Sequence, residues 1–157
     1  MRGRLGLLLL LVLAAAGLAG CGLLPGLEAT PEGPLVTLET RGGHCLQGPC
    51  GGTVVIERDG RVHDTVPRFA DRGRIPDDLR VALDQAVRSA DFERLRSRPF
   101  TGECPVNFDG QEQVYTFTTA AGSVRLASCE VEIDPADPLF LAVENAFASL
   151  AEPEPLP

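Results

Sequence analysis

The stretch TVVIERDGRVHDTV, residues 53–66, decides the fold class of this chain. Its two halves, 53–58 and 61–66, are rich in β-branched residues. Asp59-Gly60 between them is a strong signal for a two-residue hairpin turn. We therefore predict two antiparallel strands joined at this turn, and the elements on either side of the hairpin complete the fold.

Further strands are predicted on both sides of this hairpin. The alternating segment 35–40 predicts a strand before it, and residues 113–119 and 123–133 predict two strands after it. Apolar residues change parity near Leu126 in the last of these, which indicates a bulge or bend. The charged segment 67–76 is expected to be irregular.

Two longer helices follow the hairpin in the sequence. Residues 77–90 have an apolar stripe at helical spacing, and Asp91 is predicted to cap a short helical turn at 92–97. Residues 139–150 have a wide apolar stripe and follow Asp134 and Asp137, each of which precedes a proline as at many helix starts.

This order of elements predicts the fold class. Hairpins outnumber alternating strand–helix units, which favours an α+β fold with an antiparallel sheet of about five strands. The two main helices are expected to pack on one face of that sheet. The other face is expected to be partly wet and to display Glu130 and Glu132.

The N-terminus is expected to be a targeting segment. Residues 1–4 are basic and residues 5–19 form an apolar run that is short for a membrane span, as in a secretory signal peptide. Leu18-Ala19-Gly20-Cys21 resembles the lipobox of bacterial lipoproteins, in which the cysteine thiol takes a diacylglycerol. The resemblance implies a cleaved signal peptide at 1–20 and a lipid anchor on Cys21.

This resemblance and the composition together predict the organisation and location. Residues 21–34 are predicted to be a lipidated cysteine and flexible tether, 35–150 a single domain and 151–157 a disordered tail. The protein is expected on the extracytoplasmic face of a cell membrane, either inner or outer, held by acyl chains on Cys21. A net charge of −8 argues against nucleic-acid partners and against charge-driven docking on anionic lipid.

Cysteine usage is typical of an exported domain. Once Cys21 is set aside, four cysteines remain, and an even number predicts two disulfides with three possible connectivities. We favour Cys45–Cys50, which spans a Gly-Pro turn, and Cys104–Cys129. Free thiol or redox chemistry is then not expected.

The candidate catalytic and metal residues are few. An envelope enzyme or metal-binding protein would use His44, His63 and the acidic pair Glu130 and Glu132. A calcium site would add Asp134 and Asp137, although both have a structural explanation as helix caps. The chain has no nucleophile elbow and no phosphate-binding loop, so we predict no enzyme, no cofactor and no metal site. Arg94, Arg96 and Arg98 are expected to pair with surface carboxylates.

The stretches around Gly42-Gly43-His44-Cys45, Arg98–Pro105 and Ser128–Asp134 loosely resemble small exported lipoprotein domains of uncharacterised function. This resemblance carries no activity. The leading hypothesis is a non-catalytic domain that binds an envelope protein or a small ligand. An inhibitor of envelope enzymes would belong to this class. Loops 44–51 and 100–110 are the candidate contact loops, since disulfide-held loops on a rigid scaffold often carry recognition.

Overall fold

The structure, a computed structural model, describes residues 31–45 and 48–150. The predicted signal peptide, Cys21 and the predicted tail at 151–157 lie outside these residues. The strands are β1 Val36–Gly42, β2 His44–Cys45, β3 Gly48–Pro49, β4 Gly52–Ile56, β5 Arg61–Val66, β6 Ala70–Arg74, β7 Gln111–Thr119 and β8 Gly122–Ala127. The helices are α2 Asp77–Ser89, α3 Phe92–Arg96, the 3₁₀-helix η1 Pro105–Phe108 and α4 Pro138–Ala148.

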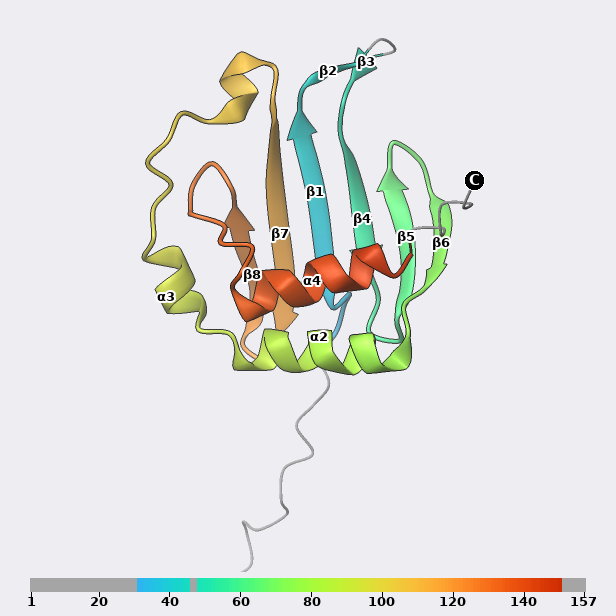
Figure 1. The fold of residues 1–157 in the computed structure, drawn as a ribbon. Helices are drawn as coiled ribbons and strands as arrows, with labels where there is room; N and C mark the ends of the chain where they lie inside the picture. The colour runs from blue at the N-terminus through green and yellow to red at the C-terminus, as the bar shows by residue number, and fades with distance from the viewer. Residues whose placement is uncertain (1–30, 46–47, 151–157) are drawn as a thin grey trace, which may run out of the picture.

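Six of the strands form one antiparallel sheet in the order β6-β5-β4-β1-β7-β8. The hairpin predicted at residues 53–66 is present as β4 and β5, and the remaining strands build outward from it. Helices α2 and α4 both lie across one face of this sheet (Figure 1). The predicted α+β fold with two main helices on one face is confirmed.

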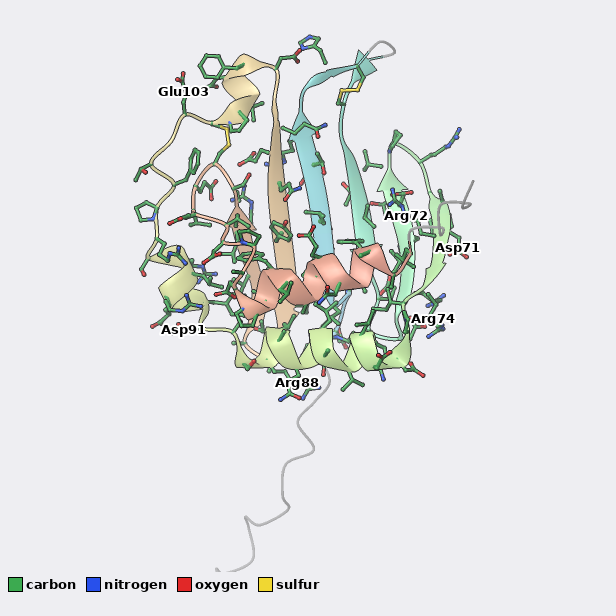
Figure 2. All side chains as sticks on the ribbon, in the orientation of Figure 1. Asp71, Arg72, Arg74, Arg88, Asp91 and Glu103 are labelled. Atoms are coloured by element: carbon green, nitrogen blue, oxygen red, sulfur yellow. A yellow bond between two sulfur atoms is a disulfide. The ribbon has the colours of Figure 1, made fainter. Side chains whose placement is uncertain are left out.

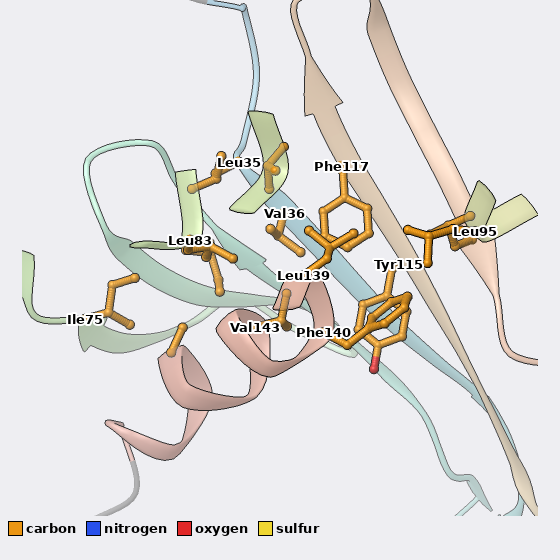
Figure 3. Close-up of a cluster of buried hydrophobic side chains, with 14 of the residues drawn as sticks. Leu35, Val36, Ile75, Leu83, Leu95, Tyr115, Phe117, Leu139, Phe140 and Val143 are labelled. Carbon is orange, nitrogen blue, oxygen red and sulfur yellow. The ribbon is translucent and has the colours of Figure 1, made fainter. Parts of the chain in front are cut away.

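The core lies between this face and the two long helices (Figure 3). Its aromatic centre is Phe117 on β7, which is fully buried, with Tyr115 two residues earlier on the same face. The ring of Phe140 from α4 lies 5.1 Å from that of Tyr115, edge to face. Leu83 of α2 and Val36 of β1 fill the space beside them, also fully buried. The period-two pattern of β7 and the apolar stripes of the helices therefore produce one shared core.

The helix starts follow the predicted capping in two of three cases. The Asp91 carboxylate accepts a hydrogen bond from the Arg94 N–H at 2.9 Å and caps α3. Asp137 accepts from the Leu139 N–H at 3.0 Å and caps α4, with Pro138 in the first turn. Asp134 starts no helix; its side chain accepts from the Ala136 N–H in a turn before α4.

The sheet has six strands rather than about five, because the segment predicted to be irregular contains β6. This edge strand is exposed along its whole length, so its sequence shows no apolar alternation. Its register with β5 shifts between Val62 and His63, opposite Gly73 with φ +96°. The strand has a bulge at a glycine, and three of its five residues are charged, so no apolar pattern in the sequence marks it.

The strand predicted at 123–133 ends at Ala127, so the parity change near Leu126 marks the end of a strand rather than a bulge within it. The N–H groups of Glu130 and Val131 both donate to the Ala127 carbonyl at 2.9 Å and close a turn. Beyond this turn Val131 makes only an isolated bridge with Pro99. The prediction that Glu130 and Glu132 lie on an open strand face is therefore wrong; both follow the sheet in a loop.

Candidate functional site

Two loops meet at one end of the six-stranded sheet. Residues 43–45 and 48–51 lie between β1 and β4, and residues 104–110 contain η1 and lead into β7. Gly42 pairs with Gln111 and Thr40 with Gly52, so both loops leave from neighbouring strands at the same end. This end lies away from α2 (Figure 1). We call the two loops together the tip.

The first loop of the tip is a short closed hairpin. His44 pairs with Pro49 and Cys45 with Gly48 as β2 and β3. The predicted disulfide Cys45–Cys50 closes it, and the Cys50 N–H donates to the Gly43 carbonyl at 3.2 Å. His44 and Cys45 are exposed. The disulfide and this hydrogen bond hold residues 43–45 and 48–50 together.

The second loop is fixed by the other predicted disulfide and by its own turn. Cys104 is bonded to Cys129, which lies in the turn after β8. The Gly110 N–H donates to the Pro105 carbonyl at 2.8 Å, and Asp109 before it is left-handed with φ 67°. A Cβ on Gly110 would lie 2.8 Å from that same carbonyl oxygen, which is closer than real Cβ atoms come. The tight approach therefore requires glycine at residue 110.

The two loops of the tip contact each other. His44 Nδ1 lies 2.9 Å from Asp109 Oδ1, although the histidine side chain is 92% exposed, so this contact contributes little stability. Val106 packs against the backbone at Gly42, where an added Cβ would lie 2.5 Å from Val106 Cγ1. Backbone packing and the two disulfides, rather than the exposed contact between His44 and Asp109, hold the tip in shape.

The tip exposes apolar side chains on this rigid support. Phe108 is 66% exposed and Val106 is 37% exposed. Glu103 lies at the same end of the molecule (Figure 2), and Asp109 directly follows Phe108 in the sequence. An exposed aromatic side chain on a constrained turn is typical of a recognition surface, because little entropy is lost when it is buried by a partner.

Val106 and Phe108 belong to the predicted contact loop 100–110, but neither residue was predicted individually as a contact. Their signal is two apolar residues at alternate positions, bounded by Pro105 and Gly110. Such residues in a turn-rich loop have no helix or strand face to bury them. That reasoning identifies them as exposed without any structure.

His63 does not lie near His44. It lies on β5, where it pairs with Val55 on β4 and Asp71 on β6, and its ring packs 5.1 Å from that of Phe69. Its Nε2 is 3.8 Å from the carboxylate of Glu57. The histidine is half-buried within the sheet and belongs to a local structural cluster.

The acidic pair forms two separate ion pairs. Glu130 Oε2 accepts from Arg125 at 2.7 Å, and Glu132 Oε2 lies 3.2 Å from Arg98. Both glutamates follow β8, which is four strands away from β5 and His63, about 19 Å at the usual strand spacing. The structure therefore does not bring the two histidines and two glutamates of the enzyme or metal hypothesis into one site.

The two aspartates of the calcium hypothesis are also occupied. Asp137 is buried and accepts from Arg94 at 2.6 Å. Burial alone would raise the pKa of Asp137, but the hydrogen bonds from Arg94 and from the Leu139 N–H hold it below its usual value. Asp134 lies 3.7 Å from Arg98. The expectation that arginines pair with carboxylates is confirmed for Arg94 and Arg98, but Arg96 has no ion pair within residues 31–45 and 48–150.

A small cavity lies at the opposite end of the molecule from the tip. It measures about 340 Å³ and is lined by Pro31, the end of α2 and the turn between β7 and β8. Arg58 closes one side of it, donating to the Thr118 carbonyl at 2.8 Å and lying 3.6 Å from Asp84. These contacts tie the β4–β5 turn, β7 and α2 together, which is a structural role.

Residues 31–45 and 48–150 contain no group of three or more His, Cys, Asp and Glu side chains placed to hold a metal ion. Among the same residues, no helix is long and apolar enough to cross a membrane.

Comparison with known proteins adds no assignment. No protein-family model matches this chain, and no curated protein matches it. The features that bear on its function are therefore the tip and the sequence of its N-terminus.

Proposed function

We propose that this protein is lipid-anchored in the cell envelope and binds a partner protein through the tip. The observation that carries the proposal is the contact between two disulfide-held loops that leave Phe108 exposed. Unlike the histidines and glutamates considered above, the tip is one continuous surface of neighbouring loops. An exposed phenylalanine and valine beside acidic residues suit a partner with an apolar pocket and a basic rim.

The direction of the chain supports this arrangement. Pro31 lies beside Ala90 at the end of α2 and Ala121 in the β7–β8 turn, at the end of the sheet opposite the tip. From there β1 runs seven residues toward the tip, about 20 Å. A lipid on Cys21 would thus hold the domain by the far end, and the tip would face away from the membrane.

The length of chain between Cys21 and Pro31 suits a tether. Nine residues, 22–30, can span at most about 30 Å. This distance allows the domain to reach partners near the membrane surface while two or more acyl chains keep it attached.

The lipid anchor is tested by Cys21→Ala in the full chain expressed in a bacterial host. We expect the variant to remain as an unprocessed precursor or to leave the membrane fraction, and the wild type to gain acyl mass on Cys21. Processing and membrane retention of the variant would contradict the lipid anchor.

The tip is tested by photo-crosslinking in cells with benzoylphenylalanine at residue 108. Val81, which is 52% exposed on α2 at the opposite end, is the matched control position. We expect a discrete crosslinked species from residue 108 and none from residue 81. Crosslinking at both positions alike, or at 81 alone, would overturn the tip as the binding surface.

A further inference from the structure

A groove runs along α4 on the helix-covered face of the sheet. Figure 1 shows α4 crossing the strands in their lower half, with no helix over their upper half. Three cavities of 230, 540 and 500 Å³ lie in succession there. The first two share Leu38 and Phe147, and the last two share Val54 and Arg72, so they form one groove from β7 to β6.

The groove has an apolar floor and one apolar wall. Leu38 and Val54 lie on the floor, only partly buried, and Phe147 on α4 and Leu150 just after α4 form the wall. Toward the tip the groove is lined by Gly52, which has no side chain to fill it and which pairs with Thr40. From β7 to β6 it spans four strand spacings, about 19 Å, which is the length of about six extended residues.

The charges of the groove are separated along its length. Glu144 stands at the β7 end. At the β6 end, the guanidinium of Arg72 makes two contacts of 2.9 Å with the carboxylate of Asp64, which balances its positive charge. Arg68 at the same end is exposed and has no ion pair within the described residues. Figure 2 shows Arg72 at this edge of the sheet.

We propose that this groove binds an extended peptide segment of a partner protein. The segment presents apolar side chains to Leu38, Val54 and Phe147 and an acidic side chain or C-terminal carboxylate to Arg68. Charge complementarity selects this occupant: the groove as a whole is close to neutral, while the chain carries a net charge of −8. An acidic group of the peptide is attracted by Arg68 at the β6 end of the groove, whereas the negative charge of the rest of the protein would repel it.

Addition of a strand at the edge of the sheet is a different binding mode that the structure disfavours. β6 is the nearest edge, but Gly73 forms a bulge there and charged side chains cover the strand. Both features protect an edge against a further strand. The segment is therefore expected to lie in the groove across the strands and not beside β6.

The test is a selection of displayed random linear peptides on the full chain, followed by affinity measurements with synthetic copies. Arg68→Glu should weaken binding by about tenfold, since a charge-assisted contact is lost. Thr40→Glu places a longer, negatively charged side chain in the cavity that Arg68 also lines and should abolish binding. Arg96→Glu, an exposed arginine of α3, is the matched control and should leave binding unchanged, and melting curves confirm that each variant folds.

Four outcomes would overturn the proposal. In the first, the selection enriches no peptide. In the second, Phe108→Ala weakens the binding of the selected peptides but Arg68→Glu does not. In the third, a heptapeptide of residues 151–157 competes with the selected peptides, and in the fourth the protein forms a dimer that Arg68→Glu dissociates. The second outcome would support the tip instead, so that failure of the groove is distinguishable from failure of the proposed function. The third and fourth would assign the groove to the chain itself.

Discussion

Removing the Cys104–Cys129 bridge should destabilise the domain more than removing Cys45–Cys50. The two bridges close segments with sequence separations of 25 and 5 residues. In the chain-entropy treatment the longer closure contributes about 3.5 kcal/mol and the shorter about 2 kcal/mol to the free energy of unfolding. At about 4 °C per kcal/mol for a domain of this size, the losses in Tm are about 14 and 8 °C.

The native contacts near the longer bridge make this comparison interpretable. The Phe100 N–H donates to the Glu130 carbonyl at 3.1 Å, and the Glu132 N–H donates to the Arg98 carbonyl at 2.8 Å. These bonds keep the segment just before the second loop beside the turn after β8 when the sulfurs are removed. The loss should therefore come mainly from the greater freedom of the unfolded chain.

The assay is urea and thermal unfolding of residues 22–157, comparing the double variant Cys104→Ser/Cys129→Ser with its matched control Cys45→Ser/Cys50→Ser. We expect the order and approximate sizes given above, with similar urea m-values for both variants. Equal losses, or a larger loss for the Cys45–Cys50 variant, would refute the chain-entropy reasoning.

Three further predictions concern single residues. Asp137→Ala should lower the free energy of unfolding by about 1 kcal/mol through loss of the α4 cap, measured by urea unfolding at pH 7. The pKa of Asp137 is held below its usual value in the fold, so the stabilising effect of its carboxylate is complete above about pH 4 and is lost as the pH falls through the lower folded pKa. An Asp137→Asn variant should show a shallower loss of stability in that range. A pH profile identical to that of the wild type would contradict this. Gly110→Ala should lower the free energy of unfolding by about 1–3 kcal/mol, because the added Cβ would meet the Pro105 carbonyl oxygen. Each kcal/mol corresponds to about 4 °C in Tm, so a Tm within 1 °C of the wild type would refute the close approach. Phe108→Ala should change stability by less than about 0.5 kcal/mol because the side chain is mostly exposed, and a larger loss would give Phe108 a structural role in place of recognition.

The strands with alternating apolar residues and the capped helices were predictable from the sequence. The hairpin of β4 and β5 rests on β-branched residues around Asp59-Gly60, and β7 on the alternation that buries Tyr115 and Phe117. In these elements local preference and burial agree, which is why pattern reasoning succeeds. The disulfide pairing also followed, because a Gly-Pro turn favours a local bridge and leaves one remaining pair.

Two elements could not be predicted because tertiary contacts decide them. β6 is a charged edge strand whose pairing depends on a bulge at Gly73, and no apolar pattern marks it. The run after Ala127 has strand-like alternation, but the backbone turns there and Cys129 is bonded to Cys104. A cross-link between distant segments overrides local strand preference at that point.

The candidate site was predicted in part. The sequence identified loops 44–51 and 100–110 as constrained, but their contact depends on β1 and β7 being neighbours, which no local signal states. The glycine at residue 42, against which Val106 packs, becomes meaningful only once the two loops are adjacent. The histidines and glutamates are chemically suited to a site, but the sheet order separates them.

The affinity of the purified full-length protein for the partner crosslinked at residue 108 tests the central claim most directly. Phe108→Ala is compared with Val81→Ala, an equally simple truncation of an exposed side chain on α2. If the tip is the binding surface, Phe108→Ala weakens binding by about thirtyfold, the effect of an interface hot spot, and Val81→Ala leaves Kd unchanged. A Kd that is the same for Phe108→Ala and the wild type would contradict the account.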